Sequence, residues 1–182
     1  MDDTTKPFSI PQLDLYRDIN WGAEQLLSIL LFRPFNTEQR RHLWKLGSIQ
    51  VLKKAAHAVI EGEPSRGLFL ILNGQLSVHK KDSLNNDAHR LATLKSGDSF
   101  GELSLFDQAP RSATVSADAQ SFLFTLDADL FQKFLDSEGD GTKAQFYHNC
   151  ARVLSEKFRI LNTDYISSQQ LLWKHALRKV KE

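Results

Sequence analysis

The stretch Ser99–Ser116, with the sequence SFGELSLFDQAPRSATVS, constrains this chain more than any other segment. Gly101 lets the backbone come close to a ligand, and Arg111 after a proline is suited to forked hydrogen bonds with an anion. Residues 102–106 predict one helical turn whose N–H groups point at the same anion. Glu102 would repel that anion unless it accepts a hydrogen bond from a hydroxyl on the same molecule. The stretch therefore predicts a ligand that carries a phosphate beside a ribose-like hydroxyl.

This pattern resembles the phosphate-binding cassette of cyclic nucleotide-binding domains, FGE[LI] followed by PR[ASTV]A[TS]V. The matching segments are Phe100-Gly101-Glu102-Leu103 and Pro110-Arg111-Ser112-Ala113-Thr114-Val115. Further upstream, IEGEP, LFLILNGQLSV and the segment 92–98 resemble other parts of the family, so the resemblance covers about residues 32–160. It is a resemblance to the domains of catabolite-activator-type regulators and of the regulatory subunit of cAMP-dependent protein kinase.

The resemblance implies a role for each matching residue. Arg111 would fork onto the cyclic phosphate, and Glu102 would accept the ribose 2′-hydroxyl. Ser112 and the alanine after it would offer N–H groups to the phosphate. Serine at this position favours cAMP over cGMP only weakly, because it keeps the hydroxyl that is associated with guanine recognition. The ligand-binding residues implied are Phe100, Gly101, Glu102, Leu103, Arg111, Ser112 and Ala113.

The composition sets broad limits on location and partners. The chain has 182 residues, 41% hydrophobic and 25% charged, as is usual for a soluble globular protein. A net charge of +1 gives no indication of nucleic acid or membrane binding. The single cysteine, Cys150, excludes an internal disulfide and is expected to be a buried, inert thiol. The acidic start MDDTTKPFS is not a secretory signal and no apolar run could cross a bilayer, so we expect a cytoplasmic protein.

The periodicity predicts a mainly β fold with flanking helices, an eight-stranded β-roll of jelly-roll type. Apolar residues alternate in short segments over residues 47–126, separated by turn residues. Asn73-Gly74 predicts a hairpin between two of these strands, and 112–117 and 120–126 predict two more. The number eight comes from the family resemblance as much as from the pattern.

Helical patterns flank the β segment on both sides. Residues 1–12 are predicted to be a flexible arm, and 13–46 to hold two helices, one over Leu13–Leu31 and one to Leu46. Asn36 and Gln39 are placed to form a capping box at the start of the second helix.

The C-terminal segment 127–182 is predicted to hold two or three helices. Asp127 would cap the first, which runs to about Leu135, and Thr142 the next, with an interruption at 162–164. The resemblance implies that these helices close over the base as a lid. The candidates for hinge and lid, chosen as apolar positions, are Leu130, Phe131, Phe134 and Tyr147.

We expect a receptor without enzymatic activity or cofactor, whose partners are the nucleotide and an effector protein or a second copy bound through the terminal helices. No two histidines have the His-x-His spacing of a metal-binding β-roll enzyme. The sequence also has no Gly-x-Ser-x-Gly nucleophile motif and no Walker loop. About 20 residues after Leu161 are too few for a DNA-binding helix-turn-helix. Two alternatives stay open: a nucleotide-independent scaffold that acts through protein contacts, and a regulatory domain that acts in trans on a separate enzyme.

Overall fold

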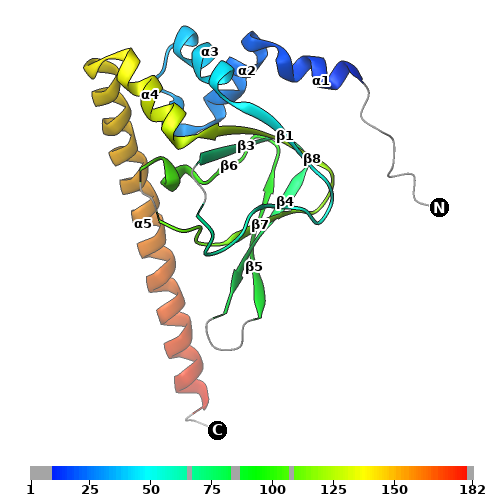
Figure 1. Ribbon diagram of the computed structural model, residues 1–182. Coiled ribbons are helices and arrows are strands. Elements are labelled where there is room, and N and C mark those ends of the chain that lie inside the picture. Colours follow the sequence, from blue (N-terminus) through cyan, green and yellow to red (C-terminus); the bar gives the residue numbers. More distant parts are fainter. Residues whose placement is uncertain (1–9, 65–66, 83–86, 107–108, 180–182) are drawn as a thin grey trace, which may run out of the picture.

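The computed structural model describes residues 10–64, 67–82, 87–106 and 109–179, and in these it forms two four-stranded antiparallel sheets (Figure 1). The first sheet has the order β1–β8–β3–β6, with β1 Ser48–Leu52, β8 Ser121–Asp127, β3 Gly67–Asn73 and β6 Ser99–Phe100. The second has the order β2–β7–β4–β5, with β2 His57–Val59, β7 Thr114–Ala117, β4 Gln75–Lys81 and β5 Ala88–Lys95. The predicted β-roll of eight strands with flanking helices is confirmed for the described residues.

The first sheet is covered on both faces. One face of β3 and β8 packs Leu68, Leu70 and Phe124 into the core beneath the helices. The other face packs Ile71 and Leu123 into a second core between the two sheets. Burial on both sides explains why these strands read as unbroken apolar runs instead of alternating.

The second sheet is buried on one face only. In β7, Val115 and Ala117 are buried in the core between the sheets, while Thr114 and Ser116 alternate with them. This period of two is the pattern from which the strand was predicted.

The hairpin predicted at Asn73-Gly74 is wrong. The strand β3 pairs with β6 and β8, whereas β4 pairs with β5 and β7, so the chain crosses here from one sheet to the other. Gly74 has φ of 110°, and a Cβ at this position would lie 2.2 Å from Ser121 Oγ. Asn-Gly supplies the positive φ that a hairpin turn needs, but a tight corner between sheets uses the same property. The pair that does form a hairpin is β4–β5, the ribbon that projects downward in Figure 1.

The predicted single helix over Leu13–Leu31 is also wrong. The segment forms α1 Ile10–Arg17, α2 Ile19–Gln25 and two short 3₁₀ turns, η1 Leu26–Ser28 and η2 Leu30–Phe32. Asp18 ends the first helix and caps the second, because its Oδ1 accepts from the N–H groups of Asn20 (2.8 Å) and Trp21 (3.0 Å). The last residues of the predicted arm, 10–12, are helical, and residues 1–9 lie outside the described ones.

The predicted capping box is confirmed at the start of α3, Thr37–Leu46. Asn36 Oδ1 accepts from Gln39 N, and Gln39 Oε1 accepts from Asn36 N, each at 2.9 Å. The buried face of α3 carries Trp44, whose ring stacks on Phe124 of β8 at a centroid distance of 4.5 Å. This contact seats the N-terminal helices on the first sheet.

Two helices follow the β-roll. Asp127 caps α4, Ala128–Glu138, as predicted, and Gly139 with φ of 85° separates it from α5, Asp140–Lys179. The predicted cap at Thr142 and the predicted break at 162–164 are wrong. Asn, Thr and Asp each lower helix stability by only tenths of a kcal/mol, which does not end a long helix.

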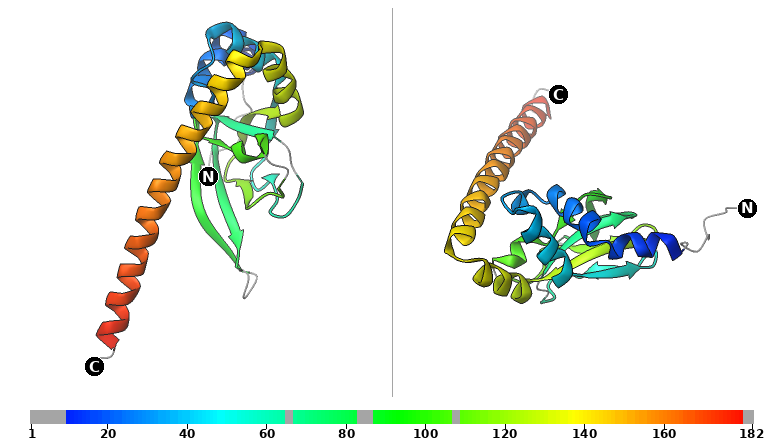
Figure 2. Two further views of the ribbon diagram at one scale, coloured as in Figure 1. Left: turned by 90° about the vertical axis from the view of Figure 1, so that its left-hand side faces the viewer. Right: turned by 90° about the horizontal axis from the view of Figure 1, so that it is seen from above.

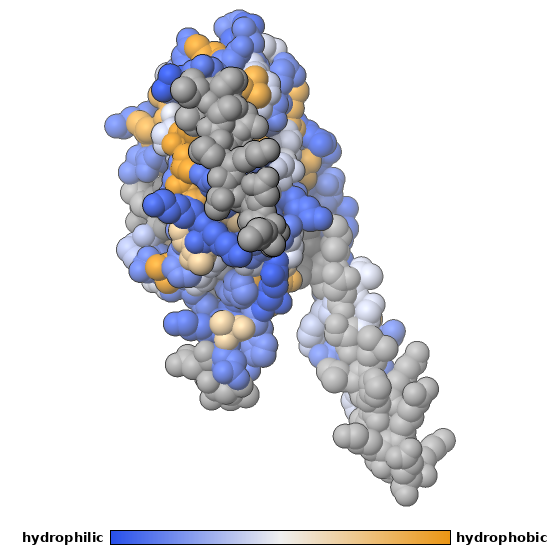
Figure 3. All heavy atoms as spheres, turned by 90° about the vertical axis from the view of Figure 1, so that its right-hand side faces the viewer, coloured by the Kyte–Doolittle hydropathy of each residue, from blue (hydrophilic) through white to orange (hydrophobic). Residues whose placement is uncertain are grey.

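The helix α5 has 40 residues, and by 1.5 Å per residue it is about 60 Å long. Its first part packs Phe146, Cys150 and Val153 into the core under the helices. The rest projects beyond the roll, past the β4–β5 ribbon (Figures 2 and 3). No helix among the described residues is long and apolar enough to cross a membrane.

Candidate functional site

The centre of the cassette is the side chain of Arg111, which is only 7% exposed. Its Nη2 donates a hydrogen bond to the carbonyl of Gly67 at 2.8 Å. Its guanidinium carbon lies 5.5 Å from the ring centroid of Phe69. Phe69 in turn stacks on Phe100, with centroids 4.8 Å apart and planes 6° apart. The cation is therefore held in a fixed position between a carbonyl and an aromatic face.

Gly101 meets this guanidinium at close range. Its φ is 80°, and a Cβ there would lie 2.6 Å from Arg111 Nη1 and 2.7 Å from the Gly67 carbonyl oxygen. Both the left-handed backbone and the missing side chain are thus required. The predicted close approach at Gly101 is to Arg111 itself.

The turn Glu61-Gly62-Glu63-Pro64 holds the backbone of Arg111. Arg111 N donates to Glu63 O at 3.1 Å, and Gly62 N donates to Arg111 O at 2.9 Å. These two bonds fix the arginine from its main chain, while Gly67 fixes it from its side chain. The sequence marked this turn only as a turn and as part of the resemblance.

The electrostatic setting of Arg111 has two opposing parts. Burial lowers its pKa from the ordinary value, and the nearby carboxylate of Glu102 acts in the opposite direction. Arginine nevertheless stays protonated in proteins. The site thus presents a permanent, partly desolvated positive charge, which is suited to a phosphodiester.

Lys80 at the end of β4 ties the cassette to the second sheet. Its Nζ donates to the carbonyl of Ser112 at 2.7 Å and to Glu61 Oε1 at 3.2 Å. Glu61 Oε2 also accepts from Lys81 N at 3.0 Å. These bonds hold the Glu61 carboxylate ionised and its pKa below the usual range.

The predicted helical turn of the cassette is the 3₁₀ turn η3, Glu102–Leu105. It lies against α5. A small groove of about 50 Å³ is lined by Glu102, Leu103 and Phe106 of the cassette, by Val153 and Leu154 of α5, and by 29–31 near η2. The ring of Phe106 also stacks on Phe146 of α5, with centroids 5.8 Å apart.

Of the other predicted cassette residues, Leu103 lies in η3 and is exposed, whereas Ser112 and Ala113 lie just before β7. Ser112 is exposed and Ala113 is half-buried, directly after Arg111. The structure therefore brings Phe100, Gly101 and Arg111 together, with Glu102 close enough to raise the pKa of Arg111 against the effect of burial.

The four lid candidates lie in two different environments. Phe131 and Phe134 are each 1% exposed and pack among Phe35, Phe146 and other rings of the core. Leu130 and Tyr147 are exposed.

Sequence reasoning missed three contacts of the cassette: the Gly67 carbonyl, the Phe69 ring and the Lys80 ammonium. A signal existed for Phe69, because it alternates with Leu68 and Leu70 and so faces the core between the sheets. Gly67 acts through its backbone carbonyl, and Lys80 reaches the cassette from a different strand, so neither residue type indicates the contact in the sequence.

Comparison with known proteins bears on this geometry. The sequence profile of the family described as "Cyclic nucleotide-binding domain" matches residues 49–138. Residues 49–138 are a cyclic nucleotide-binding domain. The match includes Gly101, Glu102 and Arg111, so the cassette geometry described above belongs to this domain.

The cyclic nucleotide-binding domain also has similar relatives and structures. The chain is 32% identical over 124 residues to a cAMP-dependent protein kinase regulatory subunit of Yarrowia lipolytica, covering 65% of this chain and 32% of that protein. The N-terminal domain of a transcriptional regulator from Streptomyces coelicolor A3(2) superposes with a TM-score of 0.68 at 26% identity, covering 75% and 94% of the two chains.

The structure of cAMP-bound PfPKA-R superposes with a TM-score of 0.59 at 26% identity, covering 72% of this chain and 44% of that one. The chain thus spans about a third of the length of the curated Yarrowia relative and less than half of this structure. Two of these similar proteins, the Yarrowia subunit and the Streptomyces protein, are described as regulatory proteins.

Proposed function

We propose that this chain is a non-enzymatic receptor that binds cAMP through the cassette. The observation that carries the proposal is the buried guanidinium of Arg111, fixed by Gly67, Phe69 and the close backbone of Gly101. A fixed, desolvated cation binds an anion strongly because little order has to be gained on binding. The cyclic phosphate is the anion that a cyclic nucleotide offers.

In this proposal the neighbouring residues select the rest of the nucleotide. Glu102 accepts the ribose 2′-hydroxyl, which turns an otherwise repulsive carboxylate into a contact specific for ribose. Ser112 and Ala113 give their backbone N–H groups to the phosphate. The choice of cAMP over cGMP is supported by two of the similar proteins, a regulatory subunit of cAMP-dependent protein kinase and a structure described as cAMP-bound.

The proposed output is a rearrangement of α5. The cassette turn touches this helix through Phe106 and Phe146, and Leu103 lies in the same groove as Leu154. A ligand that repositions η3 therefore acts directly on α5, and a ligand that prefers one arrangement shifts the population toward it. Tyr147 and Leu130 are the exposed apolar residues that we assign to the lid.

We assign an exposed stripe of α5 that runs from Tyr147 to Tyr165 to a partner surface, in the first place for a second copy of this chain. Tyr147, Leu154, Phe158 and Tyr165 are exposed. They recur at intervals of seven, four and seven residues, the spacing of a coiled-coil seam. An effector protein bound to the same face is the other outcome, and the size of the complex in solution distinguishes the two.

Isothermal titration with cAMP and then cGMP tests the proposal. We expect micromolar or tighter binding of cAMP, and the ratio of the two affinities reports the base preference. Arg111→Ala should weaken binding by a few kcal/mol, because the phosphate loses its charge-assisted partner. The matched control is Arg17→Ala, which removes an arginine from the exposed surface of α1.

Equal affinities of the Arg111→Ala variant and the wild-type protein would refute the site assignment. Absence of heat with both nucleotides, together with no thermal shift at millimolar nucleotide, would instead favour the nucleotide-independent scaffold.

A further inference from the structure

A second concave site lies on the opposite face of β7 from the core. It is a groove of about 410 Å³ that spans the strands β2, β7 and β4 and reaches the start of β5. Its strand β7 contributes Thr114 and Ser116, the residues that alternate with the buried Val115 and Ala117. The lining residues are His57, Ile60, His79, Lys80, Lys81, Ala88, Thr114 and Ser116.

Several of the lining polar groups are already oriented by the protein. Thr114 Oγ1 accepts a hydrogen bond from Glu61 N at 3.0 Å, so its hydroxyl proton is available to donate elsewhere. His57 Nδ1 lies 2.9 Å from Ser116 Oγ, which leaves its Nε2 as the outer nitrogen of the ring. A ligand in the groove therefore meets groups whose geometry is set before it binds.

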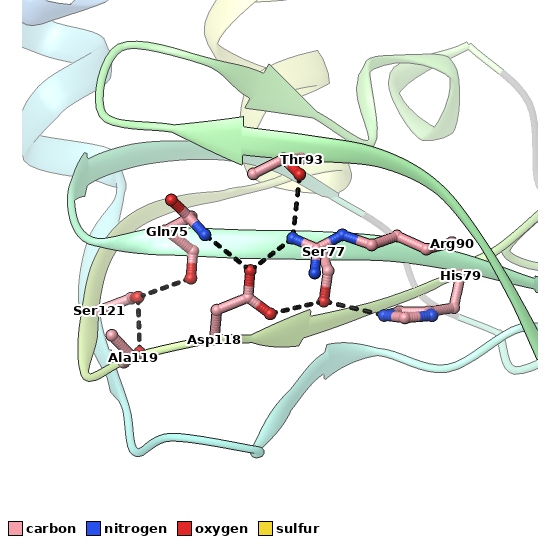
Figure 4. A network of polar contacts seen from close by, with 8 residues as sticks. All are labelled: Gln75, Ser77, His79, Arg90, Thr93, Asp118, Ala119 and Ser121. Atoms are coloured by element: carbon pink, nitrogen blue, oxygen red, sulfur yellow. Dashed lines mark hydrogen bonds and ion pairs between the residues drawn. The ribbon is translucent and has the colours of Figure 1, made fainter.

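A polar network behind the groove fixes the ring of His79 (Figure 4). The buried Ser77, 2% exposed, donates its hydroxyl proton to Asp118 Oδ1 at 2.9 Å. Since that proton is used, Ser77 Oγ accepts from His79 Nε2, also at 2.9 Å. His79 thus keeps a proton on Nε2, and the Nδ1 left for a ligand accepts a hydrogen bond in the neutral ring and donates one in the protonated ring.

Two carboxylates near the groove, those of Asp118 and Glu61, accept hydrogen bonds from other residues of the protein. Asp118 accepts from Gln75, Ser77 and Arg90, at 3.0, 2.9 and 2.7 Å. Glu61 accepts from the Lys80 ammonium and from the Lys81 backbone. The Lys81 ammonium and the Thr114 hydroxyl then supply the groove with positive charge and a hydrogen-bond donor, and each imidazole adds to them in its protonated form.

From these observations we propose that the groove binds the phosphate group of a small molecule, distinct from the nucleotide in the cassette. A volume of this size lies in the range of small-ligand sites. The side chains of Ile60 and Ala88 would cover the carbon part of such a ligand. This goes beyond the proposed function, because none of these contacts involves Arg111 or Glu102.

Occupancy of the groove would act on the cassette. Thr114 lies three residues after Arg111 on the same segment, and Lys80 links the groove to the carbonyl of Ser112. A phosphate that draws on the Lys80 ammonium would weaken that link. The ligand would therefore change the affinity of the cassette from the outer face of the sheet.

The test follows the histidine side chains by NMR while inorganic phosphate is added at constant pH, with sodium chloride at matched ionic strength as the reference. It uses the full chain and also Arg111→Ala, which lacks the cassette cation. A double variant, His79→Gln with Lys81→Gln, removes two groove contacts, and Lys95→Gln is the control that removes a lysine at the other end of the ribbon.

The proposal predicts saturating shifts of His57 and His79 by phosphate, with and without Arg111. Binding should be about tenfold weaker in the double variant, followed through His57, and unchanged in Lys95→Gln. Shifts that chloride reproduces, that never saturate, or that weaken equally in Lys95→Gln would overturn it. Melting temperatures of the variants verify that each is folded.

Discussion

The pair of substitutions Gly101→Ala and Gly97→Ala separates backbone strain from the geometry of the cassette. Both glycines have a positive φ, 80° and 90°. They differ in what a new Cβ would meet. At Gly97 there is nothing within 4 Å, while at Gly101 the Cβ would lie 2.6 Å from Arg111 Nη1 and 2.7 Å from the Gly67 carbonyl oxygen.

The magnitudes follow from these distances. Alanine in the left-handed region costs about 1–2 kcal/mol at either position. In a chain of this size that lowers Tm by roughly 2–8 °C. At Gly101 the overlap with Arg111 and with Gly67 adds about 1–3 kcal/mol of steric strain, relieved partly by moving the guanidinium. A displaced guanidinium no longer meets the phosphate, so cAMP affinity should fall at least tenfold, or about 1.4 kcal/mol.

The assay combines urea denaturation with calorimetric titration of cAMP for both variants. We expect Gly97→Ala to be moderately destabilised but to bind as the wild type does. Gly101→Ala should be destabilised more and bind more weakly, even under conditions in which it is fully folded. Equal binding by the two variants would refute the argument that Gly101 is kept to position Arg111.

Three further predictions concern stability, reactivity and assembly. Hydrogen bonds from Gln75, Ser77 and Arg90 hold the pKa of the Asp118 carboxyl below its usual range. The stabilisation by this carboxylate is therefore present above about pH 4 and is lost as the pH falls through the folded-state pKa. In urea titrations the stability deficit of Asp118→Asn should shrink between pH 7 and pH 3, and a constant deficit would contradict this. Burial raises the pKa of the Cys150 thiol to about 11. A thiol reagent at pH 8 should therefore react with Cys150 only after denaturation. Immediate full reaction of the native protein would show that Cys150 is accessible to the reagent. Phe158 is 66% exposed on the proposed coiled-coil seam. In sedimentation equilibrium, Phe158→Asp should convert the self-associated protein to monomers, while Gln170→Asp, on another face of α5, should leave it self-associated. A wild-type protein that is monomeric at all concentrations would exclude the coiled-coil assignment.

Local patterns predicted the parts of the fold that depend on local physics. The caps at Asn36 and Asp127 were identified because their hydrogen bonds reach only two or three residues along the chain. The burial of Cys150 followed from its helical period. The eight strands were found partly from alternation and partly from the family resemblance.

The failures have physical causes that lie between elements. Asn73-Gly74 forms a corner because pairing of β3 with β8 competes with pairing of β3 with β4, and the sequence near the turn does not record that choice. The break at Asp18 was missed because the apolar stripe continues across it, although its carboxylate ends one helix and begins another. The uninterrupted α5 shows the reverse, since weak helix formers at 162–164 do not outweigh the helix on either side.

For the site, the motif identified the residues but not their support. Arg111, Gly101 and Phe100 lie together as the pattern indicated. The bond from Arg111 to the Gly67 carbonyl and the bond from Lys80 to the Ser112 carbonyl are made to backbone atoms. Any residue type supplies such an atom, so no sequence pattern could have indicated them.

The most direct test of the central claim is the ³¹P NMR spectrum of cAMP mixed with the protein. If the cyclic phosphate docks on Arg111, its resonance should shift on binding to the wild-type protein and to Arg17→Ala. In Arg111→Ala the resonance should stay at the position of free cAMP at the same concentrations. A bound resonance in Arg111→Ala with the same shift as in the wild type would contradict the account, because the phosphate would then be held by other groups.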